Sequence, residues 1–561
     1  MKNLLILAAA FLMLTVITNA QTKNENQLQR FPKGVFDLQS NTKSNFEFKT
    51  TNYGIFGFDV SAGVSGGIWP RGSQNQYIFA GGFWFGAKKY RKVYNDNVNI
   101  VSISYNPNTG KGWFVPGRIE DADSLRDDLI NKYRIYFSTD FDQYTGQPLI
   151  SEDGPNWPFW ITDKDKKYHY GTYVNEYVHN ETLRNRENKP FGPLFVSDED
   201  IVSTFKDTDL NFYEGGYQIR KERGYPLRVQ VESSIYSWGE GDMHDIIIQS
   251  YVLENKSEDT YTDCWFTPVY DVDIALKSSG PFGASNDKMK FYECDTLLNL
   301  AVGWTNRDRG EEGKGFGYVG FSLLETPAVD EQKNIRTDKL IYEPSEQLGM
   351  VTFRNWNIEF DPKEDNERYD FMSSKIRDGD TGPGDKRMMF ATGPFNMKPG
   401  DKARIAVSIA FAMPAKGGEA DGTCEDIAGF VEKTNKDDSP DAQSTGKSLI
   451  DKIKRSYSNY YNGTVMSVRA NEPNQFDASV YPNPSGNEAT IDYTIKTAGQ
   501  LRISILDNLG KEISQVFSGY RNEGNYHHFI ELSKLNLTDG VYYIKLENNN
   551  NFAVKKLLIV K

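Results

Sequence analysis

The sequence predicts an all-β protein with few helices: one or two large β-sandwich domains followed by a small immunoglobulin-like β-sandwich. Two observations carry this prediction. Aromatic residues make up 13% of the 561 residues and occur with 48 glycines and 23 prolines, a composition that favours short strands joined by tight turns. Several segments also alternate apolar and polar residues with the period of two that belongs to a strand.

The first 20 residues predict a secretory signal peptide. Lys2 precedes an apolar stretch over residues 4–17, and Thr18 and Ala20 are small residues at the expected cleavage positions. The apolar stretch is shorter than the ~20 residues that span a bilayer. We therefore expect a cleaved signal and a mature chain with no transmembrane segment. Residues 21–45 are polar and are expected to be extended.

Strand patterns dominate residues 46–461, for which we considered a domain boundary near residue 225. Residues 246–253 and 405–412 are apolar runs that predict strands buried on both faces. Lys398 to Asp401, of sequence Lys-Pro-Gly-Asp, fits a type II turn before the second run. Apolar residues at helical spacing predict a late helix over residues 447–461. Residues 462–475 are rich in Asn, Ser and Gly and predict a linker.

The net charge is −13 and the mean hydropathy is −0.60. An acidic chain has no excess of basic residues to neutralise phosphates, so no nucleic-acid partner is expected.

The C-terminal segment, residues 476–561, predicts its own small sandwich of six or seven strands. Leu501, Ile503 and Ile505 alternate with polar residues, and residues 541–546 and 552–560 predict two further strands.

The same segment carries short motifs in a recognisable order. They are Tyr481, Pro482, Asn483 and Pro484 at its start, Asp507 and Gly510 in its middle, Gly540 and Tyr542 later, and Lys561 at its end. In this order the motifs resemble the type A C-terminal sorting domain of the type IX secretion system.

The resemblance implies a Bacteroidota-type cell. It implies that the secretion machinery recognises residues 476–561 as a partner, exports the cargo across the outer membrane and usually removes this domain. It also implies attachment of the cargo to surface lipopolysaccharide. The aromatic and glycine-rich stretch over residues 77–87 is similar to large β-rich cargo proteins of the same system, a group without assigned chemistry.

Calcium is the candidate cofactor. Asp271 and Asp273 lie two residues apart at an expected strand end, so both carboxylates project to one side, and Asp287 was expected to complete an oxygen cage. Asp378 and Asp380 form a similar pair. None of these loops has the twelve-residue pattern of an EF-hand.

Cysteines and tryptophans give weaker signals. In an oxidising compartment Cys264 and Cys294 could pair, leaving Cys424 over. Trp113, Trp157 and Trp160 lie beside Gly and Pro; exposed, they would stack on sugar rings, although core filling is the commoner role of aromatic residues in sandwiches.

These patterns nominate no catalytic residue. We expect a secreted, surface-targeted and non-enzymatic protein that serves in binding, adhesion or surface structure, with an extracellular glycan as a candidate ligand. The alternative is a carbohydrate-active hydrolase that uses paired carboxylates. A purely structural component is a third reading, and it predicts self-association without a ligand.

Overall fold

The computed structural model describes residues 34–141, 148–149, 197–305, 310, 316–339, 342–414, 419–428, 448–469, 476–483, 485–495, 498–507, 512–535, 537–548 and 551–560. About 48% of the described residues lie in strands, which confirms the all-β prediction. Internal contacts divide the chain into two compact units, Met1–Val465 and Met466–Lys561.

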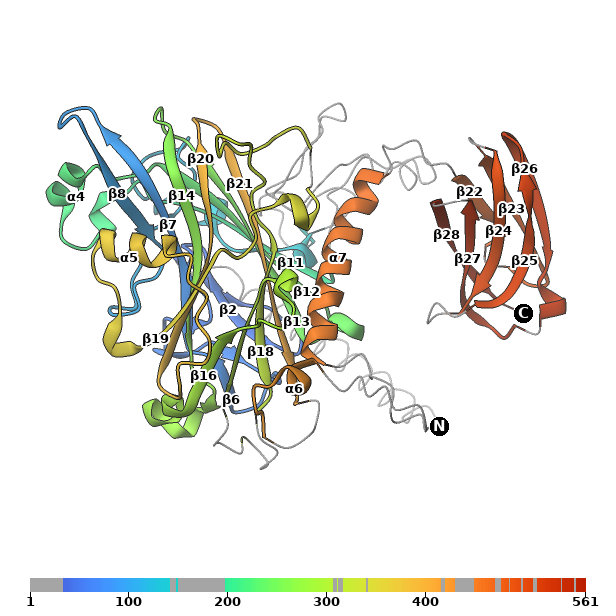
Figure 1. The fold of residues 1–561 in the computed structure, drawn as a ribbon, viewed down its shortest axis with the longest axis horizontal. Helices are drawn as coiled ribbons and strands as arrows, with labels where there is room; N and C mark the ends of the chain where they lie inside the picture. The colour runs from blue at the N-terminus through green and yellow to red at the C-terminus, as the bar shows by residue number, and fades with distance from the viewer. Residues whose placement is uncertain are drawn as a thin grey trace, which may run out of the picture. The chain divides into compact units, whose positions relative to one another are not determined.

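The larger unit is built on two antiparallel sheets (Figure 1). The nine-stranded sheet runs in the order β10 (Tyr136–Phe137), β11 (Glu199–Lys206), β12 (Val229–Ser237), β13 (Ile246–Asn255), β21 (Lys402–Ala412), β18 (Tyr318–Glu325), β17 (Leu300–Thr305) and β16 (Asp287–Phe291), with β9 (Val115–Pro116) beside β11. The five-stranded sheet runs in the order β19 (Thr352–Asn357), β20 (Lys386–Met397), β14 (Tyr261–Val272), β7 (Ala80–Arg91) and β8 (Asp96–Ile103). Both sheets combine strands from before and after residue 225.

A smaller third sheet and short helices complete this unit. The sheet contains β1 (Leu38–Ser40), β2 (Glu47–Thr51), β5 (Gly67–Ile68), β6 (Asn75–Ile78) and β15 (Ala275–Leu276), and β3 (Phe58–Asp59) pairs with β4 (Val64–Ser65). The α-helices are α2 (Ile130–Tyr133), α4 (Tyr217–Arg223), α5 (Asp365–Ser373), α6 (Cys424–Ala428) and α7 (Leu449–Arg469).

Aromatic rings fill the space between the two large sheets. Phe83 on β7 lies 5.4 Å from Tyr251 on β13 and 5.2 Å from Phe266 on β14, measured between ring centroids. All three side chains are fully or almost fully buried. The high aromatic content is therefore explained by this core, because each ring buries a large apolar area between the sheets.

Helix α7 covers the other face of the nine-stranded sheet. Its residues Leu449, Ile453 and Tyr460 join Ile246 and Ile248 of β13 in a second buried cluster. Because this sheet is covered on both faces, the uninterrupted apolar runs of β13 and β21 are buried throughout most of their length. The helix was expected over residues 447–461, and its backbone continues to Arg469.

The turn between β20 and β21 lies where the sequence placed it. Gly400 adopts a φ of +82°, the conformation that a type II turn requires at its third position and that favours glycine.

The smaller unit is a seven-stranded sandwich with its own core. One sheet contains β22 (Phe476–Tyr481), β23 (Glu488–Ile495) and β26 (Gly524–Glu531), and the other contains β25 (Glu512–Arg521), β24 (Gly499–Leu506), β27 (Gly540–Asn548) and β28 (Asn551–Ile559). Leu501, Ile503 and Ile505 are fully buried, as their alternation predicted. No helix of the described residues is long and apolar enough to cross a membrane. The expected signal peptide lies outside the described residues.

Candidate functional site

Three carboxyl groups meet where β14 ends and β20 begins. The strand register places Arg387 opposite Asp271 and Lys386 opposite Val272, so Asp385 comes level with Asp273 just beyond the paired residues. Oxygen atoms of Asp271, Asp273 and Asp385 all lie within 4.8 Å of one another. We call these three residues the carboxyl cluster.

One arginine neutralises part of this charge. Arg387 Nε lies 3.3 Å from Asp271 Oδ2, and the Arg387 guanidinium also forms an ion pair with Asp361. All three side chains are almost fully buried. Tyr105 donates a weak hydrogen bond of 3.4 Å to Asp271 Oδ2. Within the described part of the chain, the carboxyl groups of Asp273 and Asp385 form no hydrogen bond or ion pair, and Arg387 offsets the charge of Asp273 only at a distance.

The electrostatics follow from burial and crowding. Burial raises the pKa of Asp271, while Arg387 opposes the change. Burial and the neighbouring carboxylates of Asp271 and Asp385 raise the pKa of Asp273 well above its usual range. Burial, with Asp271 and Glu359 nearby, raises the pKa of Asp385 to about 6. Such a cluster can share protons or bind a cation.

A calcium ion fits the donor chemistry. Oxygen atoms within 4.8 Å of one another can all approach a central ion at roughly 2.3–2.6 Å, the usual calcium–oxygen distance. Asp287, the third ligand suggested by the sequence, instead uses Oδ2 to accept a 2.9 Å hydrogen bond from the backbone N–H of Ile274. Asp385 was missed because it lies 112 residues after Asp273 in the chain, and only the pairing of β14 with β20 brings the two together.

The second acidic pair is already neutralised. Asp378 Oδ2 lies 3.0 Å from Arg354 Nε, and Asp380 Oδ2 lies 3.1 Å from Lys288 Nζ.

The cysteine pairing differs from the expectation. The disulfide joins Cys294 to Cys424, whose Cα atoms are 6.2 Å apart, and Cys264 is a buried thiol. The proposed pairing of Cys264 with Cys294 was therefore wrong. Cys264 lies within β14 and packs inside the main core, whereas Cys294 is exposed in the loop after β16. Burial raises the pKa of the Cys264 thiol well above its usual range, which makes it unreactive.

Trp113 is also buried and packs against Tyr213, with ring centroids 4.8 Å apart. It is therefore a core residue, while Trp157 and Trp160 lie outside the described residues.

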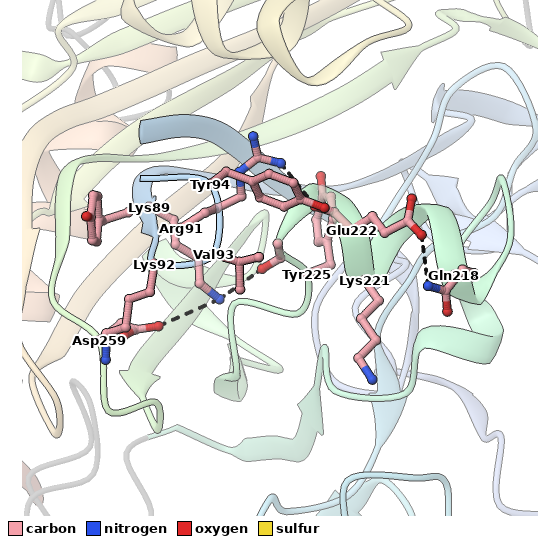
Figure 2. Close-up of a pocket in the computed structure, with 12 residues that line it drawn as sticks. Lys89, Arg91, Lys92, Val93, Tyr94, Gln218, Lys221, Glu222, Tyr225 and Asp259 are labelled. Carbon is pink, nitrogen blue, oxygen red and sulfur yellow. Dashed lines mark hydrogen bonds and ion pairs between the residues drawn. The ribbon is translucent and has the colours of Figure 1, made fainter. Parts of the chain in front are cut away.

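A pocket lies at the opposite end of the five-stranded sheet, between the β7–β8 turn and α4 (Figure 2). Its volume is about 450 Å³. Tyr90, near the end of β7, and Val93 and Tyr94, in the β7–β8 turn, line it and are 47%, 89% and 55% exposed. We call this cavity the hairpin pocket.

Glycines position α4 beside the turn. Gly216 precedes the helix with a φ of +90°, and Gly224 ends it in the left-handed conformation with a φ of +106°. The N–H of Gly224 donates to the carbonyls of Arg220 and Lys221, which closes the helix. A Cβ on Gly224 would come within 3.1 Å of Ile100 and 3.3 Å of Arg91, so only glycine lets the helix end pack this closely on β8 and the turn.

Four cationic side chains line the pocket, and they differ in whether the protein supplies them with a hydrogen-bonding partner. Lys89 and Arg91 are held by the protein. Lys89 Nζ donates to the carbonyls of Gly224 and Pro226 at 2.9 and 3.1 Å, and burial lowers its pKa. Arg91 forms a two-bond ion pair with Asp96 at 2.9 and 2.5 Å.

Lys92 and Lys221 are the other two cations. Both are exposed, and neither ammonium group has an ion pair or a hydrogen bond to any described residue. Figure 2 shows their side chains on opposite sides of Val93.

Sequence reasoning missed this pocket, although a signal existed. Residues 88–94 read Lys-Lys-Tyr-Arg-Lys-Val-Tyr and residues 217–223 read Tyr-Gln-Ile-Arg-Lys-Glu-Arg. Two basic and aromatic tracts in an acidic chain mark an unusual local surface. Their proximity depends on the tertiary fold.

In the smaller unit, the sorting motif ties the start of the segment to its last strand. Asn483 Oδ1 accepts a 2.8 Å hydrogen bond from the backbone N–H of Leu558, and the N–H of Ser485 donates to the carbonyl of Leu558 at 2.8 Å. Tyr481 donates to Asp492 Oδ2 at 2.9 Å, and Tyr542 Oη accepts from the N–H of Thr538 at 3.2 Å. Pro484, Gly510 and Lys561 lie outside the described residues.

Comparison with protein families identifies this unit. Residues 479–561 match the family described as the secretion system C-terminal sorting domain. The chain therefore carries a type IX sorting domain, which implies recognition by the type IX machinery and secretion or display at the cell surface.

The other comparisons concern the chain as a whole. No curated protein matches the chain. Among solved structures, a polysaccharide lyase matches at 9% identity over 66% of this chain, with a TM-score of 0.17. A β-glucuronidase from Faecalibacterium prausnitzii matches at 11% identity over 44% of this chain (TM-score 0.12), and dimeric latent PorU from Porphyromonas gingivalis at 11% over 76% (TM-score 0.14). The matches cover 37%, 38% and 41% of those three structures. Superpositions this loose carry no argument about fold or chemistry.

Proposed function

We propose that this protein is a non-enzymatic glycan-binding protein of the cell surface, used for adhesion. The hairpin pocket is the observation that carries the proposal. It exposes two tyrosine rings beside groups that can hydrogen-bond to hydroxyls, and it sits at the tip of a rigid sandwich. Sugar rings stack on aromatic faces through their C–H groups, and fixed polar groups then set the orientation.

We also propose the route by which the cargo reaches this position. The signal peptide directs passage across the inner membrane, and a type A sorting domain directs passage across the outer membrane. Removal of this domain near residues 462–475 would leave the cargo attached to surface lipopolysaccharide. Mass spectrometry of the protein from the cell surface tests this, since an intact C-terminus on the surface form would contradict it.

The test of glycan binding is retention without turnover. The full-length chain is incubated with a panel of polysaccharides, and both bound protein and released sugar are measured. Retention that is weakened by Tyr90→Ala/Tyr94→Ala, without sugar release, is the expected result. Absence of retention on every polysaccharide would favour the purely structural role, which predicts self-association.

A second proposal assigns calcium to the carboxyl cluster, with Asp271, Asp273 and Asp385 as ligands. The ion would compensate buried negative charge that Arg387 leaves unbalanced. Calcium would then stabilise the ends of β14 and β20, far along the sheet from the pocket. The melting temperature is measured in calcium and in chelator, and an unchanged value would remove this proposal.

The competing function is a carbohydrate-active hydrolase that uses two carboxyl groups. The raised pKa of Asp385, about 6, would suit a general acid. The oxygen atoms lie within 4.8 Å of one another, close to the roughly 5–5.5 Å between the carboxyl groups of retaining glycosidases, so measured turnover is what separates the two functions. Sugar release by the wild-type chain but not by Asp385→Asn would establish the hydrolase instead.

A further inference from the structure

Two lysines in the hairpin pocket, Lys92 and Lys221, form no ion pair or hydrogen bond with a described residue, although the Lys221 ammonium lies 5.8 Å from the centroid of the Tyr217 ring. Lys89 and Arg91, their neighbours, are each fixed by the protein. An exposed ammonium group that no carboxylate pairs with attracts an anion locally, even though the chain carries −13 overall. We propose that the hairpin pocket binds an acidic polysaccharide, whose carboxylate or sulfate groups pair with Lys92 and Lys221. This inference rests on the glycan-binding function proposed above.

Tyr94 supplies a stacking face for the sugar ring. The Arg91 guanidinium covers one side of the ring, 4.4 Å from its centroid, and the ring is still 55% exposed. Arg91 is itself fixed by Asp96 and by the carbonyl of Glu222 at 3.0 Å. Tyr94 is thus held in place without the ligand, so little conformational entropy is lost on binding.

A second depression adjoins the hairpin pocket at Arg91. It has a volume of about 430 Å³. Its lining includes the amides of Asn97, Asn99 and Asn366. Amides both donate and accept hydrogen bonds, which suits sugar hydroxyls. Arg223, Glu364 and Asp365 also line this depression, so its amides add hydroxyl recognition within a mixed-charge surface beside the lysines of the hairpin pocket.

The charge pattern favours a glycan over a nucleic acid. A nucleic-acid site neutralises many closely spaced phosphates, commonly about 6–10, whereas Glu222 and Asp259 interrupt the cations here. Acidic polysaccharides carry one charge per one or two sugar rings and present hydroxyls between the charges. Interspersed lysines, tyrosines and amides match that pattern.

The test compares a neutral glycan with its sulfated form, with a carboxylated glycan and with a polyanion that is not a glycan. The full-length chain is titrated with dextran, dextran sulfate and polygalacturonate, and with single-stranded DNA as a non-glycan polyanion. Lys92→Gln/Lys221→Gln is the test variant. Lys111→Gln/Lys277→Gln is the matched control, because both lysines are exposed and follow the far ends of β8 and β14.

We expect the test variant to bind dextran sulfate or polygalacturonate about tenfold more weakly, because it lacks two exposed charge contacts with the polymer. The control should bind like the wild type. If the test variant loses affinity for polygalacturonate alone, the lysines bind carboxylate groups. If it loses affinity for dextran sulfate alone, they bind sulfate groups. Tyr94→Ala should weaken binding of either polymer.

Other outcomes overturn the inference. The inference is wrong if the wild type and the test variant bind the acidic glycans equally well, or if the control loses as much affinity as the test variant. It is also wrong if DNA binds as tightly as the acidic glycans. Binding of neutral dextran alone would overturn the acidic ligand and leave the glycan-binding function standing. Failure to bind any glycan would overturn both.

Discussion

The two ends of the five-stranded sheet carry opposite chemistry, one on β14 and β20 and the other on β7 and β8. At one end, Asp271, Asp273 and Asp385 crowd around one buried arginine. At the other end, the β7–β8 turn presents lysines and tyrosines to solvent. Burial therefore determines whether a charged side chain needs a partner within the protein. A buried carboxyl group must be paired, protonated or bound to a cation, while an exposed ammonium group remains free to meet a ligand.

The largest expected effect is the loss of the buried arginine. Arg387→Met would leave Asp271 and Asp361 buried without their cation, and we expect the free energy of unfolding to fall by about 3–5 kcal/mol. Urea denaturation measures it. The matched change at the other end, Arg91→Met, removes an exposed ion pair and should cost about 1 kcal/mol or less. Equal decreases in the free energy of unfolding for the two variants would contradict the expected difference between the buried and the exposed end.

Calcium removal should come next. At a calcium concentration about 100 times the dissociation constant, binding adds ~2.7 kcal/mol of stability, and chelation should lower the melting temperature by a few degrees. Asp273→Asn/Asp385→Asn should abolish that dependence. Asp378→Asn, at an acidic residue paired with Arg354, is the control and should retain it.

The pH dependence of stability sharpens the same contrast. The pKa of Asp385 rises from its ordinary value near 3.8 to about 6 in the folded protein, so the folded state binds more protons than the unfolded state between these values. In chelator, stability should therefore fall as the pH rises from about 4 to about 6. Denaturation across this range tests the sign. Asp385→Asn should flatten the dependence of stability on pH. The prediction is contradicted if stability rises with pH in the wild type and Asp385→Asn abolishes that rise.

The smallest expected effect lies at the hairpin pocket. Tyr94→Ala removes an exposed ring that contributes no buried contact to the core, and the free energy of unfolding should change by no more than about 0.5 kcal/mol. The same denaturation experiment measures it. A large loss would mean that the turn supports the sandwich, which would weaken its assignment as a binding surface.

Local pattern was enough to predict the strands. The apolar runs that became β13 and β21, the turn at Gly400 and the alternation of Leu501, Ile503 and Ile505 all depend on neighbouring residues, which the sequence lists in order. Asp271 and Asp273 could be nominated for the same reason, because side chains two residues apart on a strand share a face.

The cysteines show where local pattern fails. Nothing near Cys264 in the chain indicates that β14 lies in the middle of a sheet with its thiol inside the core, and nothing near Cys424 indicates that α6 brings it beside Cys294. The choice of partner depended on contacts between residues 130 positions apart.

The all-β class, the small C-terminal sandwich and the sorting motifs could therefore be predicted from the sequence, because strand periodicity and turn chemistry are properties of short segments. Which charged side chains lie close together depends on the tertiary structure. The β14–β20 register added Asp385 to the carboxyl cluster and used Asp287 elsewhere, and the packing of α4 against the β7–β8 turn formed the hairpin pocket. Both sites join segments more than 100 residues apart, and their properties depend on burial that no local pattern encodes.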